Sequence, residues 1–413
     1  MTRGPAVLAG LLPIVVACTA PPSGTVHRAD PTDSDADTDT DTDTDTDTDT
    51  DTDTDADTEP SDTGELRGVW VDRWTFDSAD DVETIMANSA SAGFNTVFFQ
   101  IRGQADAYYS SQYEPWSKNL SGTLGQDPGW DPLATAVASG HAHGLAVHAY
   151  VNAFTLWSGT TAPTESTPRH AYLQHPDWLV ADDSGTPMAL NSSYVWMSPG
   201  NPAVRERLRD VVQDIVTHYD VDGVHLDLVR YPGADYSHDG TSEALWDSAT
   251  YPDYGDWQRA MVVEAVQGVQ AVSTVPVTAA VWGIYTNDWG WSSVSEGRND
   301  YYQDSRAFLS SGASDGNMPM MYWPVTSTPG ERLDFTTLVQ DFVAHDSDRY
   351  IFAGINAELG KSDTLACVES ARANGARGIV IFDYGVMQDG GWLQDLKAEL
   401  FADPTTMPTF PWR

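Results

Sequence analysis

Ionisable side chains alternate with aliphatic ones in the run Val-His-Leu-Asp-Leu at residues 224–228. Successive side chains of a β-strand point to opposite faces, so His225 and Asp227 would share one face, with valine and leucine on the other. A carboxyl group on such a face can act as an acid, a base or a nucleophile. The run therefore predicts a strand with one packed face and one face that carries chemistry.

Polar residues occupy the same alternate positions in four other strand-like runs. A single polar residue in such a position is usually a hydrogen-bonded core group. Five strands that all direct polar groups to one face instead indicate a shared site. The pairs in the other four runs are Gln100 and Arg102, His148 and Asn152, Asn356 and Glu358, and Trp70 and Asp72.

Short runs of strand-forming residues alternate with helical patterns after residue 64, as parallel strands with crossover helices do. Eight such units predict an α/β fold of the (β/α)8 barrel type at residues 65–402, followed by a C-terminal tail at residues 403–413. In this fold the segments after the strands build the active site, and here they are long and rich in Trp, Tyr, Asn and Asp. The predicted strands lie within residues 67–73, 95–102, 145–154, 222–232, 276–285, 316–323, 349–358 and 377–385.

The N-terminus has the pattern of a secretory signal. One arginine precedes an apolar run that is too short to span a bilayer, and small residues lead to Cys18. The order Val-Val-Ala-Cys resembles a lipobox, so residues 1–18 are predicted to be a lipoprotein-type signal with Cys18 as the lipidated residue. The alternative is an ordinary cleavage site near Cys18. The prediction places the protein in the cell envelope, anchored to a membrane outside the cytoplasm, in the outer membrane or at the cell surface.

Residues 19–64 contain a long Asp-Thr repeat without large apolar residues. Such a segment cannot bury enough surface to offset the entropy lost on folding, so we expect a disordered, self-repelling tether. Of the formal charge of −40, residues 1–29 give about +2 and residues 30–62 about −16, which leaves the remainder acidic in its own right. This charge excludes nucleic acid as a partner and favours a neutral or cationic substrate over an anionic polymer.

The candidate chemistry needs no cofactor. The inward histidines His148 and His225 could join Asp227 at a metal, but no His-x-His pair or His-Glu-x-x-His motif is present, and we predict none. No phosphate-binding glycine loop or nucleophile elbow occurs either. Cys367 is predicted to be a packed helix residue. Tryptophans in the segments after the strands favour sugars, because flat aromatic rings stack on sugar faces while polar groups read the hydroxyls.

Long segments of the chain resemble the bacterial family-ten-like glycosyl hydrolases. They include LRGVWVDRW from residue 66, HAHGLAVHAYVNAF from residue 141, DGVHLDLVRYPG from residue 222 and GARGIVIFDYG from residue 375. Members of this family include a division-site lipoprotein that cuts peptidoglycan glycan strands lacking stem peptides. The resemblance implies a β/α barrel and a glycosidase, with Asp227 on the first aspartate of the family's fourth-strand motif. Leu228 stands where many members have a second acid.

Glycoside hydrolysis normally uses two carboxyl groups. Asp227 is the first, and we expect Glu358, inward on the seventh strand, to be its partner, ahead of Asp106, Asp72, Glu114 and Asp383. The expected substrate is a polysaccharide, with peptidoglycan glycan as the first candidate. We expect the following residues to bind it: Gln100, Arg102, Asp106, His148, Asn152, His225, Arg230, Tyr231, Trp282, Tyr322, Trp323 and Asn356. Two other functions remain open, a non-catalytic glycan-binding lipoprotein and a metal-dependent polysaccharide deacetylase.

Overall fold

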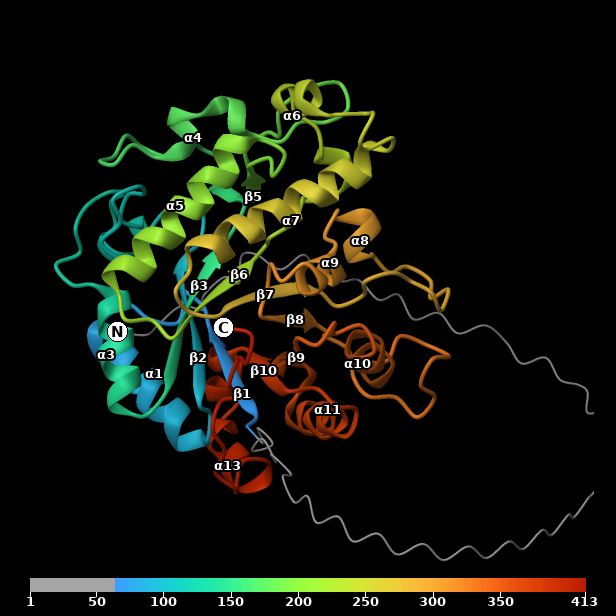
Figure 1. Ribbon diagram of the computed structural model, residues 1–413. Coiled ribbons are helices and arrows are strands. Elements are labelled where there is room, and N and C mark those ends of the chain that lie inside the picture. Colours follow the sequence, from blue (N-terminus) through green and yellow to red (C-terminus); the bar gives the residue numbers. More distant parts are fainter. Residues whose placement is uncertain (1–63) are drawn as a thin grey trace, which may run out of the picture. The chain divides into compact units, whose positions relative to one another are not determined.

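A closed barrel of eight parallel strands forms the centre of the protein (Figure 1). The computed structural model describes residues 64–413; the predicted signal with Cys18 and the tether up to residue 63 lie outside the described residues. Neighbouring strands follow the order β1, β10, β9, β8, β7, β6, β3, β2, which confirms the predicted (β/α)8 fold. The strands are β1 (Leu66–Val71), β2 (Thr96–Arg102), β3 (Ala146–Asn152), β6 (Gly223–Asp227), β7 (Val277–Trp282), β8 (Gly316–Met320), β9 (Tyr350–Asn356) and β10 (Gly378–Phe382).

Helices separate successive barrel strands and pack around the barrel (Figure 1). The longest is α7, and α5 begins as its sequence predicts, with the Asn201 side chain accepting from the Ala203 N–H and Pro202 in the first turn. The helices are α1 (Ala79–Ala92), α2 (Lys118–Ser121), α3 (Pro132–Ala142), α4 (Ala171–Gln174), α5 (Pro202–His218), α6 (Gly240–Leu245), α7 (Tyr254–Val272), α8 (Gly297–Asp300), α9 (Ser305–Ser310), α10 (Phe335–Val343), α11 (Lys361–Ala373), α12 (Tyr384–Asp389) and α13 (Leu396–Glu399). Among the described residues, no helix is both long and apolar enough to cross a membrane.

The barrel interior is a packed core, separate from the larger core between the strands and the helices. Val224 and Leu226 belong to the outer core, so the alternation along β6 is as predicted. The interior is filled mainly by Leu66, Trp70, Phe98, Tyr150, Ala280, Met318, Phe352 and Val380. A filled interior leaves room for a ligand only above the last inward side chains.

His148 and His225 lie inside this packed interior, which corrects their predicted role in substrate binding. Both are fully buried. The Trp70 Nε1–H donates to His225 Nε2 at 3.0 Å, and His225 Nδ1 lies 3.0 Å from the Thr278 hydroxyl. Burial lowers the pKa of both imidazoles, for His148 to about 4. The two rings are therefore neutral core groups inside the barrel, below the end at which the strands finish.

The longest connection, between β3 and α5, adds a small sheet beside the mouth. It contains the antiparallel pair β4 (Thr155–Gly159) and β5 (Asn191–Trp196) and the single-turn helix η1 (Pro176–Trp178). Tyr194 of β5 accepts a hydrogen bond of 2.7 Å from Arg73, which follows β1. This contact ties the added sheet to the loop after the first strand.

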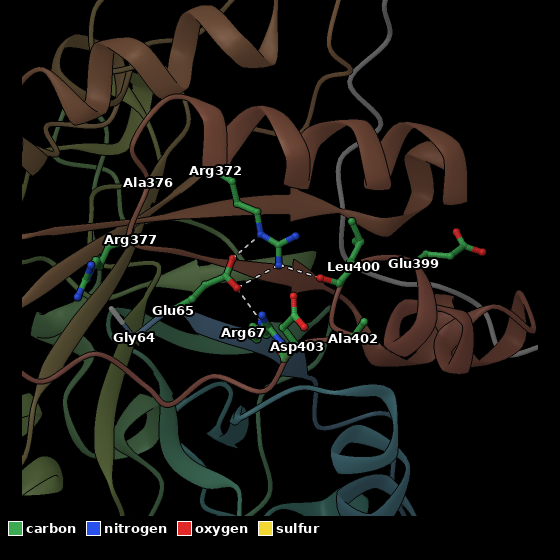
Figure 2. Close-up of a pocket in the computed structure, with 10 residues that line it drawn as sticks. All are labelled: Gly64, Glu65, Arg67, Arg372, Ala376, Arg377, Glu399, Leu400, Ala402 and Asp403. Atoms are coloured by element: carbon green, nitrogen blue, oxygen red, sulfur yellow. Dashed lines mark hydrogen bonds and ion pairs between the residues drawn. The ribbon is translucent and has the colours of Figure 1, made fainter. Parts of the chain in front are cut away.

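The C-terminal tail packs against the opposite end of the barrel, where the strands begin. The buried carboxylate of Asp315 accepts from Trp412 Nε1 at 2.7 Å and from Arg413 Nε at 2.8 Å. Figure 2 shows a polar pocket of about 500 Å³ at this end, in which Glu65 pairs with Arg67 and Arg372. These pairs leave the pocket walls neutralised by their own charges. The predicted chemistry lies at the other end, which we call the mouth.

Gly223 is required by the packing of the interior. A Cβ on this residue would lie 2.3 Å from the His148 ring, well inside van der Waals contact. We expect Gly223→Ala to lower the free energy of unfolding by about 1–3 kcal/mol, measured by urea denaturation. Gly268→Ala in α7, where a Cβ meets no atom within 4 Å, is the matched control and should be neutral or stabilising by up to ~1 kcal/mol. Equal effects would contradict this packing requirement.

Candidate active site

Asp227 ends β6 and directs its carboxyl group into the mouth. The Tyr150 hydroxyl donates to Asp227 Oδ2 at 2.5 Å, and the Leu228 N–H donates to Oδ1 at 2.6 Å. Burial raises the pKa of this carboxyl group, while the two donors and the nearby charge of Arg230 oppose the rise. Because both oxygens accept hydrogen bonds, the ionised form fits this environment. Asp227 is thus placed to act as a base or a nucleophile.

Asp383 follows β10 and is the second carboxyl group of the mouth. It caps α12, with Oδ1 accepting from the Val386 N–H at 2.9 Å. Burial raises its pKa to about 6, and the like charges of Asp72 and Glu358 act in the same direction. A carboxyl group with this pKa holds its proton at mildly acidic pH. Asp383 therefore has the environment of a general acid.

The hydroxyl group of Tyr322 is close enough to both carboxyl groups to sense their charges. Burial raises the pKa of its hydroxyl well above the usual value, and the charges of Asp227, Asp383 and Glu358 all add to the rise. Its ring is stacked on Phe382, the last residue of β10, with the ring centroids 6.0 Å apart. The three acids come from different strand ends, so Tyr322 marks where they converge. These acids and Tyr322 follow the strands β6, β8, β9 and β10.

The alternation predicted that Glu358 lies on the seventh barrel strand, β9, and this prediction is wrong. Glu358 belongs to the single-turn helix η3 (Ala357–Leu359) after β9, and its side chain is exposed. Asn356 holds this turn, because its Oδ1 accepts from the Glu358 N–H at 2.9 Å and its Nδ2 donates to Glu358 Oε2 at 3.3 Å. Glu358 thus faces the mouth from its rim, and the buried Asp383 is the better partner for Asp227.

Two other candidate acids are buried away from the mouth. Glu114 forms a two-pronged ion pair with Arg102 at 2.8 and 2.7 Å, and Arg102 is only 1% exposed. The remaining donors of Arg102 go to the carbonyl groups of Asn152 and Ala153. Asp106 is fully buried and accepts from the Gln104 N–H at 3.2 Å. The predicted substrate contacts of Arg102 and Asp106 are therefore wrong, and both residues support the scaffold.

Gln100 and Asn152 likewise support the mouth from below. The Gln100 amide donates to Asn152 Oδ1 at 3.0 Å, and Asn152 donates to the Gly103 carbonyl at 3.0 Å. Gln100 Oε1 accepts from the backbone N–H of Arg73 at 3.1 Å. These buried side chains have protein partners, so their predicted contact with a substrate is replaced by a role in holding Arg73.

The four predicted tyrosine and tryptophan residues lie in different surroundings. Tyr231 is fully buried, so it cannot touch a substrate as predicted. Trp323 packs against the outer core, beside Cys367 of α11, rather than standing free at the mouth. Trp282 and Tyr322 are partly exposed at the strand ends, although Trp282, like Trp323, also packs against the outer core; their contact with a substrate stays a prediction.

Sequence analysis missed Tyr150 and Arg73, which shape the mouth together with Trp74, one of the tryptophans predicted to stack on sugars. Tyr150 is inward on β3, midway between His148 and Asn152, and the same alternation that selected those two would have found it. Arg73 and Trp74 follow β1; the Arg73 guanidinium lies 4.5 Å from the centre of the Trp74 ring, and Trp74 is 57% exposed. An exposed tryptophan that is held by a cation–π contact can stack its free face on a sugar ring.

The described residues contain no group of three or more histidine, cysteine or acidic side chains arranged to hold a metal ion. The mouth offers carboxylates on separate strand ends, and its two histidines are buried below them.

Comparison with known families and proteins identifies close sequence relatives. The family model of the glycosyl hydrolase-like 10 proteins matches residues 65–360. "Glycosyl hydrolase YngK" of Bacillus subtilis is 31% identical over 252 residues, which make up 56% of this chain and 47% of that protein. "Glycosyl hydrolase DigH" of Escherichia coli K12 is 31% identical over 258 residues, 56% of this chain and 55% of that protein. The chain thus spans about half the length of the curated relatives it matches.

Solved structures share the barrel. The glycoside hydrolase domain of PgaB (BpsB) from Bordetella bronchiseptica superposes with a TM-score of 0.60 at 12% identity, over 84% of this chain and 100% of that one. The catalytic domain of β-amylase from Paenibacillus polymyxa gives a TM-score of 0.58 at 12% identity, over 83% of this chain and 99% of that one. At these identities the likeness establishes the fold.

The surroundings of Asp383 lead to a prediction about its pKa that can be measured. By carboxyl carbon NMR, Asp383 should titrate with a pKa of about 6. In Asp72→Asn the pKa of Asp383 should fall, because one of the like charges that oppose its ionisation is removed. Glu369→Gln on the exposed face of α11 should leave the pKa unchanged. A pKa for Asp383 in the ordinary aspartate range, or one that is insensitive to Asp72, would contradict the site as described.

Proposed function

Because the chain belongs to the glycosyl hydrolase-like 10 family, with a match over residues 65–360, we propose that it hydrolyses glycosidic bonds at the barrel mouth. The observation that carries this proposal is the pair Asp227 and Asp383, two carboxyl groups in different environments that both approach Tyr322. Glycosidases need one carboxyl group protonated and another ionised on either side of the scissile bond. Burial raises the pKa of both groups, but both oxygens of Asp227 accept hydrogen bonds that favour its ionised form, whereas the charges of Asp72 and Glu358 favour the protonated form of Asp383.

In the proposed reaction Asp383 donates its proton to the glycosidic oxygen as the bond to the anomeric carbon breaks. Asp227, whose two oxygens accept hydrogen bonds from Tyr150 and Leu228, reacts in its ionised form and either attacks the anomeric carbon or removes a proton from the attacking water. One water is consumed for each bond: its hydroxyl group ends on the anomeric carbon, and its proton restores the acid. Tyr150 is a positioning residue in this scheme, because it acts through Asp227.

Aromatic side chains at the mouth provide the surface for the sugar rings. Trp74 stands on the β1 side, Trp282 ends β7, and Tyr322 lies over the carboxyl groups. Flat aromatic rings bury the apolar faces of sugars and leave the hydroxyls free for polar contacts. These rings come from three strand ends, as expected for a chain-like substrate that crosses the mouth.

We infer that the substrate is an extracytoplasmic polysaccharide, with peptidoglycan glycan strands as the first candidate. The signal-like sequence up to Cys18 supports an envelope location and a membrane anchor, and the resemblance to a family with a peptidoglycan-cutting member supports the glycan.

Digestion of peptide-free peptidoglycan strands tests the proposed function. The full chain should release defined muro-oligosaccharides, read by mass spectrometry, and Asp227→Asn should slow this release by at least ~100-fold. Glu369→Gln, far from the mouth on α11, is the control and should retain full activity. Intact strands in every sample despite measurable binding would favour a glycan-binding lipoprotein. Release of acetate that a chelator abolishes would favour a metal-dependent deacetylase.

The pKa of Asp383 sets the expected pH dependence. Asp383 must keep its proton to act as the acid, and its pKa is raised to about 6, so kcat/KM should fall as the pH rises through about 6. At lower pH the rate should fall again when Asp227 becomes protonated. A bell-shaped profile measured on the released oligosaccharides would agree with this assignment. Constant activity from pH 5 to pH 9 would contradict it.

A further inference from the structure

Arg230 is a cation without an acidic partner beside the proposed catalytic carboxylate. It follows Asp227 in the loop after β6, and no carboxylate of the described residues lies within 4.0 Å of its guanidinium group. Arg102, by contrast, is fully paired with Glu114. Asp227 is near enough to favour the charge of Arg230 but accepts its own hydrogen bonds from Tyr150 and Leu228. The positive charge of Arg230 is therefore only partly balanced within the protein.

Three aromatic rings enclose the guanidinium group. Its central carbon lies 5.0 Å from the Trp196 ring centre, 5.4 Å from that of Trp282 and 4.5 Å from that of Tyr301. Cation–π contacts of this kind stabilise a cation but leave its N–H donors unpaired. One donor, on Nη1, reaches the Tyr231 carbonyl at 3.0 Å, and Nε is buried without a partner.

The enclosure is held from several sides, so it does not depend on a ligand for its shape. Gln303 donates to the Val229 carbonyl at 3.1 Å, and the Tyr231 N–H donates to the Tyr301 carbonyl at 3.1 Å. The Trp282 Nε1–H is fixed on the Ser295 carbonyl at 2.6 Å. A guanidinium group that is already held in place, with unpaired N–H donors, loses little conformational entropy when it binds an anion.

The chemistry of the unpaired group indicates its ligand. A partly buried charge without a partner is costly, and an incoming anion removes that cost. Guanidinium donors lie in a planar fork that matches a carboxylate, and such charge-assisted pairs are the stronger hydrogen bonds of proteins. Hydroxyl groups of a neutral sugar would fill the donors but leave the charge unbalanced.

We propose that Arg230 is a specificity-determining residue that binds a carboxylate carried by a sugar unit next to the scissile bond. The ligand class is an acidic sugar, in which the carboxylate is part of the ring substituents, as in a lactyl ether or a uronic acid. This inference rests on the proposed function, because it places the acidic sugar at the same mouth. It adds a preference that the two catalytic carboxyl groups alone do not provide.

The overall acidity of the domain limits where such a carboxylate can go. The long-range charge favours neutral or cationic substrates, but at physiological ionic strength it is screened over ~8 Å. The charges of Asp72 and Glu358, which also raise the pKa of Asp383, repel an anion from the β1, β9 and β10 side of the mouth. Arg230 lies on the β6 and β7 side, so a carboxylate has one favourable position. The opposing charges would fix the direction in which the glycan crosses the mouth.

Matched glycans provide the test. Chitin oligosaccharides and peptide-free peptidoglycan strands of equal length differ in the lactyl ether on alternate sugars, and chemical reduction of the strand carboxylates to alcohols removes only the charge. Binding is measured by calorimetry on the full chain carrying Asp227→Asn, which prevents cleavage. Reduction should weaken binding by about 10- to 100-fold, the loss expected for a charged hydrogen bond. In Arg230→Gln the same reduction should weaken binding less than about threefold, and Arg230→Lys should keep part of the preference.

The outcomes separate this inference from the proposed function. Equal loss of affinity for all three glycans in Arg230→Gln would overturn the inference and make Arg230 a residue that positions Asp227. Hydrolysis that needs Asp227 but is indifferent to carboxyl reduction would overturn it too, and would leave the proposed function intact. A carboxylate preference that depends on Arg230, in a protein that cleaves no strand, would support the inference and contradict the proposed function. Thermal unfolding of Arg230→Gln at the wild-type midpoint excludes misfolding as the cause of any loss.

Discussion

The filled interior of the closed barrel is the constraint on which the rest of the structure depends. Parallel strands that close on themselves send alternate side chains inward, and the lower layers must pack against each other. Trp70, Phe98 and Met318 fill this space, and His225 shares it with them as a neutral ring. Only side chains at or beyond the last inward position of each strand remain accessible. The mouth therefore takes its acids from strand ends, where Asp227 and Asp383 stand.

The alternation of residue types predicts which face a side chain takes but not how high it lies. This is why the eight strands and the orientation of Asp227 could be predicted, while His148 and His225 were placed one layer too high. Depth depends on the stagger between neighbouring strands, which no single run contains. Arg102 illustrates a second limit, because its partner Glu114 comes from a loop whose path the sequence does not reveal. Asp383 ranked behind Glu358 as the partner of Asp227, because its raised pKa depends in part on Asp72 and Glu358, which come from other strand ends.

The electrostatics of the mouth follow from burying like charges together. Several carboxyl groups converge on Tyr322, and their mutual repulsion favours a proton on the most buried of them, Asp383. Donors from Tyr150 and Leu228 keep Asp227 suited to the ionised state. Such an arrangement costs folding stability, and sites of this kind are generally retained for function. The barrel offsets that cost elsewhere, through its two cores and the tail that is anchored on Asp315.

The central claim is that Asp383 supplies the proton and Asp227 does not. The most direct measurement compares Asp383→Asn with the wild type on two substrates, the natural glycan strand and a dinitrophenyl glycoside of the same sugar. The dinitrophenolate leaves without a proton, so the variant should lose at least ~100-fold in kcat/KM on the strand and far less on the aryl glycoside. Equal losses on both substrates, or no loss on the strand, would contradict the assignment of Asp383 as the acid.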